Sequence, residues 1–307
     1  MIEKYDYDII VVGAGTAGMT AALYALRGGK TVLLLEKETF GGQISFSPRV
    51  ENFPSIKEIA GSEFADNLFE QVTHHGAQVE LETVQSVAKD GVGFIVTTDY
   101  RSYTSKAVVI AAGVKHRHLG LPREEEFLGK GVYYCALCDG DFYRGEEVSL
   151  IGDGNTALQY ALLLSNICSK VTVITMFDKF FGEPTLVERL KARDNVEIIQ
   201  GYLAESFIGE DKFEGILFRE TNGTKSLEVY TKAVFVAIGQ VPDNHCFEGI
   251  VSLDKQGFII ADETTATITD GVYAAGDCRV KKVRQLTTAV ADGANAAIAA
   301  CAYIDRI

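Results

Sequence analysis

The sequence predicts an α/β fold in which one three-layer domain is inserted into another. Three observations predict this fold. The chain has 307 residues, enough for two domains. A strand, a glycine-rich turn, a helix and a second strand follow one another near the N-terminus, and the same order recurs in the middle of the chain. Hydrophobic residues make up 47% and charged residues 23% of the chain, so we expect an ordinary folded protein.

The net charge and the cysteines limit the classes of function. A formal net charge of −13 disfavours binding to nucleic acid or to an anionic membrane. Apolar stretches such as 107–114 are too short to span a bilayer, and the N-terminus enters a strand without a signal peptide. We therefore expect a cytoplasmic protein with no membrane or nucleic-acid partner. In that compartment the only closely spaced cysteines, Cys135 and Cys138, need a redox or metal-binding explanation.

The first glycine turn has the context that a dinucleotide pyrophosphate requires. It joins a strand at 7–12 to a helix that ends at Arg27, and its glycines are Gly13, Gly15 and Gly18. Glycines let the backbone approach an anion, and the helix N-terminus supplies free amides and a positive dipole. A second strand at 31–35 is followed by Glu36, whose carboxylate is suited to bind ribose hydroxyls. These features predict a Rossmann-like domain.

The second glycine turn repeats the backbone pattern without the same side chains. It follows a strand at 148–151, and its small residues are Gly152, Gly154 and Ala157. The next strand, 170–175, ends at Thr175, where the first copy has an acid, and no arginine follows to bind a 2′-phosphate. Asp153 also places a like charge against a pyrophosphate. The turn is therefore either a vestigial nucleotide site or a device for close helix–strand packing.

The C-terminal segment completes the first domain. Apolar strands near 107–113 and 233–239 mark where the chain crosses between domains. Asp277 is placed to bind polyol hydroxyls, and a helix opening near Gln285 is placed to bind an electron-rich ring edge. This predicts a discontinuous FAD-binding domain, 1–115 with 246–307, and an inserted NAD(P)-binding-like domain, 116–245, which carries the cysteine pair.

The cysteine pair favours redox chemistry. Cys135 and Cys138 can form a disulfide or bind zinc, but there is no second CxxC and the other four cysteines are isolated, so no metal site is predicted. A dithiol and a flavin in one chain suggest electron transfer into a disulfide, followed by thiol exchange with an outside substrate. Asp139 is suited to move the proton of the departing thiol, and its position is equally compatible with a helix N-cap.

The order and spacing of these motifs resemble those of the low-molecular-weight thioredoxin reductases, which are flavoprotein disulfide reductases. The resemblance extends over nearly the whole chain. It is carried by Gly13-x-Gly15-x-x-Gly18, Gly41-Gly42-Gln43, Glu51-Asn52-Phe53-Pro54, Cys135-Ala-Leu-Cys138-Asp139-Gly140, Gly152-x-Gly154-x-x-Ala157, Gly276-Asp277 and Arg284-Gln285.

The resemblance implies a homodimeric, FAD-dependent reductase of thioredoxin. It implies that Cys138 accepts electrons from the flavin, that Cys135 forms a mixed disulfide with thioredoxin, and that Asp139 acts as acid and base. It also implies that the inserted domain rotates about the crossover strands. The residues expected to hold non-covalent FAD are Gly13, Gly15, Thr16, Ala17, Gly18, Glu36, Lys37, Gly42, Gln43, Asn52, Gly113, Gly276, Asp277, Arg284 and Gln285.

The chain departs from this family at the site of the electron donor. Members that use NADPH carry an HRRxxxR run, whereas the aligned residues 175–181 read TMFDKFF and contain no arginine. An arginine contact to a 2′-phosphate is not replaced by Met or Phe, so NADPH is not expected to be an efficient donor. Ferredoxin, used by similar family members, is favoured over NADH because Thr175 offers no acid to a ribose and Asp153 opposes a phosphate.

Two surface features follow from the same comparison. The apolar residues 176–177 and 180–181 either cover the nucleotide cleft or, as we favour, pack within their domain. A basic patch where an acidic protein can dock is expected beside the flavin, formed by Arg279, Lys281, Lys282 and Arg284.

Two other functions remain open. An FAD-dependent dithiol oxidase would keep the flavin and the CxxC but pass electrons to oxygen. Oxidases resembling this fold tend to have His after the second cysteine, where this chain has Asp139. A non-enzymatic flavin-binding scaffold would leave the cysteines idle, and serine at Cys135 would then change no activity.

Overall fold

The chain divides into two compact units. The computed structural model describes residues 5–47 and 50–307. The first unit combines Met1–Lys115 with Val241–Ile307, and the second is His116–Gln240. The second crossing therefore precedes residue 246, the boundary expected from the sequence. The connecting segments contain two short paired strands, β7 (Lys115–His116) and β16 (Gln240–Val241).

The first unit is built on a seven-stranded sheet with the order β3-β2-β1-β6-β5-β4, and β17 pairs with β6. Its strands are β1 (Tyr7–Val12), β2 (Val32–Glu36), β3 (Gln78–Leu81), β4 (Val84–Asp90), β5 (Gly93–Thr98), β6 (Ser102–Ile110) and β17 (Val272–Ala274). Its helices are α1 (Thr16–Arg27), α2 (Gly61–His74) and α7 (Leu286–Ile304), with 3₁₀ turns η1 (Gly42–Phe46), η3 (His245–Phe247) and η4 (Gly276–Cys278). The strands β3, β2, β1, β6 and β17 run parallel to one another. Strand β5 pairs antiparallel with both β6 and β4.

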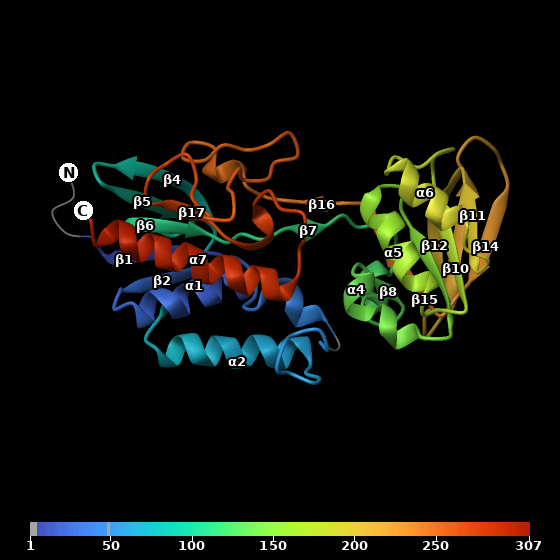
Figure 1. Cartoon of the computed structure of the whole chain (residues 1–307), viewed down its shortest axis with the longest axis horizontal. Helices are drawn as coiled ribbons and strands as arrows, with labels where there is room; N and C mark the ends of the chain where they lie inside the picture. The colour runs from blue at the N-terminus through green and yellow to red at the C-terminus, as the bar shows by residue number, and fades with distance from the viewer. Residues whose placement is uncertain (1–4, 48–49) are drawn as a thin grey trace. The chain divides into compact units, whose positions relative to one another are not determined.

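Strand β1 is apolar and buried from Ile9 to Val12, because both faces of the sheet are covered there. Ile9 and Val11 pack with α1 and α7, which lie side by side on one face (Figure 1). Ile10 and Val12 point to the other face, where they meet the β4–β5 hairpin and apolar residues from the segment 247–261. The sheet edge at the carboxyl end of β1 is thereby held rigidly, and the first glycine turn begins there.

The second unit contains three layers. Its strands are β8 (Val132–Tyr133), β9 (Glu147–Ile151), β10 (Lys170–Thr175), β11 (Val196–Gln200), β12 (Tyr202–Ile208), β13 (Gly215–Glu220), β14 (Ser226–Tyr230) and β15 (Ala233–Val236). Its helices are α3 (Glu124–Phe127), α4 (Ala136–Asp139), α5 (Asn155–Ser165) and α6 (Pro184–Lys191), and η2 (Gly140–Tyr143) is a 3₁₀ turn. The order β11-β10-β9-β15-β8 forms a parallel sheet, and β12-β13-β14 forms a separate antiparallel sheet.

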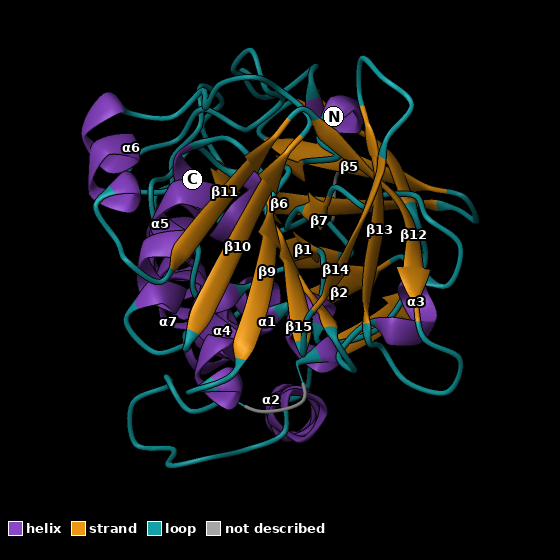
Figure 2. Ribbon diagram, turned by 90° about the vertical axis from the view of Figure 1, so that its right-hand side faces the viewer, coloured by secondary structure: helices purple, strands orange, loops and turns teal. Residues whose placement is uncertain are grey.

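The parallel sheet of this unit lies between helices α4, α5 and α6 on one face and the antiparallel sheet on the other (Figure 2). Leu150 and Val173 pack with residues of α5 and α6. Ile151 and Ile174, which point the other way, pack with Ile216 and other residues of β12–β14. Because β9 and β10 pair in parallel, their carboxyl ends lie at the same edge of the sheet, where the second glycine turn begins.

The predicted fold class is confirmed, since both units are α/β with parallel sheets of the Rossmann type. Several element ends also agree with the prediction: β10 ends at Thr175, α1 at Arg27, and α7 begins directly after Gln285. Within the described ranges, no helix has the length and apolar character needed to cross a membrane.

Candidate functional site

The first glycine turn presents open backbone at the start of α1. Gly13 has φ +102°, and a side chain there would collide with the carbonyl oxygen of Ala111. A Cβ on Gly15 would meet only the Gly41 carbonyl oxygen, at 3.9 Å, so the space above this residue is free. No side chain caps the helix, and its first turn contains no acid. The turn is therefore suited to receive an anionic group at free amides.

The first turn of α1 is embedded in the core. Thr16 and Ala17 are buried, and Gly18 lies against the Gly13 carbonyl. These residues fix the shape of the turn.

Glu36 connects the end of β2 to this turn. Its Oε2 accepts a hydrogen bond from the Ala14 amide at 2.8 Å, and its Oε1 accepts from the amides of Lys37 and Glu38 at 2.9 Å. A carboxylate has about four acceptor positions, so further acceptor capacity remains for hydroxyl groups. The Lys37 ammonium is paired with Asp243 at 2.9 Å, which directs its charge to a carboxylate of its own unit.

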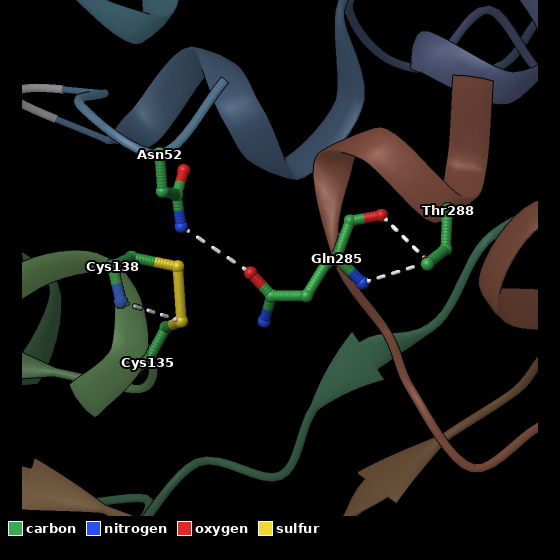
Figure 3. The surroundings of a disulfide bond; sticks show 5 residues. All are labelled: Asn52, Cys135, Cys138, Gln285 and Thr288. Carbon is green, nitrogen blue, oxygen red and sulfur yellow. Dashed lines mark hydrogen bonds between the residues drawn. A yellow bond between two sulfur atoms is a disulfide. The ribbon is translucent and has the colours of Figure 1, made fainter. Parts of the chain in front are cut away.

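Other residues expected at the cofactor site lie at turns and at the start of α7. Gly42 opens η1, and the Gln43 amide donates to the Val114 carbonyl. Asn52 Nδ2 donates to Gln285 Oε1 at 3.3 Å (Figure 3). Gln285 and Thr288 form a capping box at the N-terminus of α7. Gly113, with φ +65°, has no neighbouring atom within 4 Å of an added Cβ.

Asp277 provides the clearest sign that this unit holds a polar ligand. The residue lies in η4, and its Oδ1 is buried with no hydrogen-bond partner among the residues that the structure describes. Burial raises the pKa of its carboxyl, whereas Lys281 and Arg284 act in the opposite direction. A buried carboxylate oxygen without a partner costs free energy, and a ligand hydroxyl would relieve that cost. Together with the open turn at Gly15, this orphan acceptor fits a dinucleotide that carries a polyol chain.

The expected basic patch is wrong for two of its four residues. Arg279 is 1% exposed, and the Lys281 side chain is 5% exposed. Both are bound by Asp292, a residue that the sequence analysis did not single out. Burial of the Arg279 and Lys281 side chains leaves Lys282 as the one exposed cation of the four. Arg284 is partly buried, and its Cζ lies 4.3 Å from the centroid of the Phe258 ring. The sequence shows four neighbouring cations but not that two of them have an internal counter-charge.

The signal that could have identified Asp292 is its surroundings in the sequence. It is the single charged residue of the helix Leu286–Ile304, which is otherwise rich in alanine. An acid within such a helix faces either solvent or an internal cation, and only the tertiary structure distinguishes the two.

In the second unit, Cys135 and Cys138 form a disulfide (Figure 3). Cys135 is the N-cap of the short helix α4, and its Sγ accepts a hydrogen bond from the Cys138 amide at 3.2 Å. Leu137, between the two cysteines, is 51% exposed, so the segment reaches the surface of its unit. An amide directed at Sγ stabilises a thiolate on Cys135 once the disulfide is reduced.

Asp139 is a buried carboxyl directly after this disulfide. It is 6% exposed, its Oδ1 has no hydrogen-bond partner within the described ranges 5–47 and 50–307, and burial raises its pKa to about 7. Asp139 does lie at the N-cap position of η2, as the alternative interpretation expected, but its side chain makes no cap hydrogen bond there. A carboxyl with a pKa near neutrality can both donate and accept a proton under ordinary conditions.

The second glycine turn is open, but the side chains around it are poorly suited to bind a nucleotide. A Cβ on Gly154 would meet nothing within 4 Å, so backbone access resembles that of the first turn. The Thr175 side chain, however, is 2% exposed, and its hydroxyl accepts from the Phe177 amide at 3.2 Å. Burial also raises the pKa of Asp153.

The packing of this turn follows the predicted pattern. Gly152 lies against the Ala237 carbonyl and the Ala157 side chain, which brings α5 close to the strands.

The segment after β10 folds back over the start of α5. The Phe181 amide donates to the Asp153 carbonyl at 2.9 Å, and the Glu183 amide donates to Asn155 Oδ1 at 2.7 Å. Phe180 packs on the core of the unit, as favoured from the sequence. Phe177 and Phe181 do not: they are 39% and 58% exposed, with ring centroids 4.9 Å apart. Met176 is also exposed, so internal packing explains only one of the four apolar residues.

No cluster of three His, Cys, Asp or Glu side chains able to hold a metal ion occurs within residues 5–47 and 50–307. The structure brings Glu36 to the glycine turn and Asn52 to Gln285. It also brings Cys135 to Cys138.

Comparison with known proteins gives consistent matches over almost the whole chain. The family model described as pyridine nucleotide-disulphide oxidoreductase matches residues 7–293. A thioredoxin reductase of Treponema pallidum is 38% identical over 303 residues, which cover 98% of each chain. A protein described as a 34.2 kDa protein in the rubredoxin operon of Clostridium pasteurianum is 36% identical, with 99% of each chain covered.

A solved structure agrees with these matches. The crystal structure of thioredoxin reductase from Streptococcus pyogenes superimposes with a TM-score of 0.93 and 34% identity, covering 98% of this chain and 99% of the other.

Proposed function

We propose a function for this chain from one premise: the chain belongs to the pyridine nucleotide-disulphide oxidoreductase family, among the flavoprotein disulfide reductases. The proposed function is FAD-dependent reduction of the thioredoxin disulfide through Cys135 and Cys138. Relatives that bear the name thioredoxin reductase support the choice of substrate.

The observation that carries the proposal is the disulfide itself. Cys135 and Cys138 are bonded, and an amide is directed at Cys135 Sγ at 3.2 Å. The other cysteines are unpaired, and burial raises the pKa of Cys168 and Cys246 to about 11 and of Cys278 to about 12. Thiols with such pKa values are poor nucleophiles at neutral pH. The pair at 135 and 138 is therefore the one equipped for thiol exchange.

The first unit is proposed to bind FAD non-covalently. The open turn at Gly15 and the acceptor at Glu36 are suited to its phosphates and ribose, and Asp277 is suited to the hydroxyls of its ribityl chain. When bound, FAD supplies a two-electron carrier that can reduce a disulfide.

The second unit is proposed to perform the thiol chemistry. Two electrons and two protons convert the Cys135–Cys138 disulfide into two thiols. The Cys135 thiolate then attacks one sulfur of the thioredoxin disulfide: a mixed disulfide forms, the thioredoxin bond breaks, and the departing sulfur takes a proton. The Cys138 thiolate attacks Cys135 Sγ, which releases reduced thioredoxin and restores the internal disulfide. Asp139, with a pKa raised by burial to about 7, is proposed to exchange the protons.

The electron donor is proposed to be ferredoxin, with NADH second and NADPH excluded as an efficient donor. The second glycine turn is followed by a buried Thr175 instead of an acid, and by Met176 and Phe177 where NADPH-using members carry arginines. At this site the ribose of a pyridine nucleotide would meet no acidic side chain, and the 2′-phosphate of NADPH would meet no arginine. Ferredoxin needs no nucleotide site, so the lack of these side chains would not prevent electron transfer from ferredoxin.

The assembly and location are proposed on the resemblance to the same family. We propose a homodimer in the cytoplasm, with thioredoxin as the protein substrate.

One experiment tests both the reaction and the donor. The holoprotein is mixed anaerobically with oxidised thioredoxin and reduced ferredoxin, NADH or NADPH, while flavin absorbance and new thioredoxin thiols are followed. We expect fast bleaching and thiol formation with ferredoxin and little of either with NADPH. Fast bleaching by micromolar NADPH would overturn the donor assignment. Failure to form thiols with any donor that bleaches the flavin would overturn the reductase itself, and oxygen uptake on a dithiol would then favour an oxidase.

A further inference from the structure

Asp292 is the centre of a buried charged cluster in the first unit. The residue lies in α7 and is 3% exposed. It accepts four hydrogen bonds: from Arg279 Nε and Nη2 at 2.8 Å, from Lys281 Nζ at 2.9 Å and from the Gly276 amide at 3.0 Å. Three of these donors bind Oδ2 and one binds Oδ1, so the carboxylate is held by groups of its own unit, which makes it an internal anchor rather than an open site.

The cluster contains one more cation than Asp292 can neutralise. Arg279 and Lys281 are both buried and positive, and Asp292 supplies one negative charge. Arg279 also contacts Glu263 at 3.4 Å, but that carboxylate is 90% exposed and therefore strongly hydrated. The buried group nearest in sequence that can supply the second negative charge is Asp277, whose Oδ1 has no partner.

Asp292 also fixes the backbone that carries Asp277. Gly276, which has φ +76°, donates its amide to Asp292, and an added Cβ at this glycine would lie 2.8 Å from the Ala17 side chain. The neighbouring Gly293 lies directly against the Ala17 carbonyl. One short stretch of α7 therefore holds the turn before Asp277 and the first turn of α1 in a fixed relation.

We propose that Asp292, together with Arg279 and Lys281, is a positioning group that holds Asp277 where its free carboxylate oxygen accepts hydrogen bonds from the hydroxyls of the ribityl chain of a bound flavin. This inference rests on the proposed function, because it requires FAD in the first unit. None of the three residues needs to touch the cofactor.

The charges of the cluster matter as well as its geometry. Only an ionised carboxylate is a pure acceptor, and burial favours the neutral form of Asp277 by raising its pKa. The groups that act on it are Lys281, Arg284 and Arg279, which lower its pKa, and Asp292, which raises it. Removing a cation should therefore make Asp277 take up a proton at higher pH and release the ligand there.

The test measures FAD affinity of the holoprotein directly, by the fluorescence of flavin released on dilution across a pH series. In Asp292→Asn we expect at least about a tenfold loss of FAD affinity, because hydrogen bonds to a charged group are lost and the turn is released. In Lys281→Met, which keeps the Asp292–Arg279 pair, we expect the acid limb of FAD release to move to higher pH. The matched control is Glu263→Gln, which removes the exposed partner of Arg279 and should leave affinity within about twofold.

The outcomes separate the inference from the proposed function. A folded wild-type protein that binds no FAD would overturn both. Wild-type binding that is unchanged in Asp292→Asn would overturn the inference alone. If Asp292→Asn does not fold, Lys281→Met decides: an acid limb at the wild-type pH means that the cluster only supports the fold, since a merely structural role does not move that limb.

Discussion

The two glycine turns have similar backbones and different surroundings. Both are open above their middle glycine, and both begin a helix that no side chain caps. In the first unit the next strand ends in Glu36, whose carboxylate contacts the turn at 2.8 Å. In the second unit it ends in Thr175, whose hydroxyl is buried and already bonded to the Phe177 amide.

This difference shows where ligand recognition resides in such a fold. The glycine turn is a backbone feature that also serves the close packing of helix on strand, so it persists without a ligand. Binding of a nucleotide also requires a suitable side chain at the end of the following strand and suitable charges near the turn. The second unit has no such side chain but carries the disulfide, which supports the proposal that the first unit binds the cofactor and the second performs the thiol chemistry.

The largest expected effect comes from the cysteines of the second unit. Cys135→Ser and Cys138→Ser should each reduce thioredoxin turnover by about a thousandfold or more, because each removes a sulfur that the exchange requires. FAD binding by the first unit should not change. The matched control is Cys301→Ser, a partly buried cysteine outside the disulfide, which should keep nearly full turnover. A Cys135→Ser protein that still reduces thioredoxin would contradict the division of labour.

The next largest effect on turnover is expected at Asp139 in the second unit. Asp139→Asn should lower turnover by about a hundredfold and remove an inflection near the pKa of about 7 from the pH profile. The inflection is measured from initial rates across a pH series, and a variant that keeps it would show that another group moves the proton.

The same substitution has a predicted effect on stability with the opposite sign. Because the folded pKa of about 7 lies above the ordinary 3.8, the folded state binds the extra proton between these values. The free energy of unfolding should therefore fall as pH rises through that window and stay low above it. Asp139→Asn removes this loss, so its urea midpoint should exceed that of the wild type at about pH 8 but not at about pH 4.

A smaller effect is expected in the first unit. Glu36→Gln should weaken FAD binding by about ten- to a hundredfold, since hydrogen bonds to a charged acceptor contribute about 1.5–3 kcal/mol. The equivalent change in the second unit, Thr175→Val, should leave FAD affinity unchanged. Equilibrium titration by flavin fluorescence compares the two, and equal losses would mean that the second turn also contributes to FAD binding.

The smallest expected effect is a gain. Arginines at the exposed positions 176, 177 and 181, introduced together, should raise the rate of flavin bleaching by NADPH by about tenfold through charge-assisted contacts to the 2′-phosphate. The control carries glutamines at the same positions. If bleaching by NADPH does not rise above that of the glutamine variant, the missing arginines are not what separates this turn from a working nucleotide site.

The sequence predicted those parts of the molecule that depend on local pattern. Strand β10, the end of α1 and the start of a helix near Gln285 follow from apolar runs, paired glycines and an alanine-rich stretch within a few residues. The pairing of Cys135 with Cys138 is likewise a matter of spacing, although the residues alone left zinc as an alternative.

What failed depends on contacts between distant segments. Arg279 and Lys281 were expected at the surface because cations usually are, and their burial depends on Asp292 in another element. The raised pKa of Asp139 also depends on the core around it, because burial causes the shift. Phe177 and Phe181 are exposed although their type favours the interior, and nothing in their local pattern indicates this.

The most direct measurement follows electrons from flavin to thioredoxin in the absence of ferredoxin and of pyridine nucleotides. The holoprotein is photoreduced anaerobically, oxidised thioredoxin is added, and flavin absorbance and thioredoxin thiols are recorded in the wild type and in Cys138→Ser. The account predicts that thioredoxin reoxidises the wild-type flavin, with two thioredoxin disulfides reduced per flavin, one by the electrons of the flavin and one by those of the reduced Cys135–Cys138 pair, and that the Cys138→Ser flavin stays reduced. A wild-type flavin that thioredoxin cannot reoxidise, or a variant flavin that it reoxidises equally fast, would contradict it.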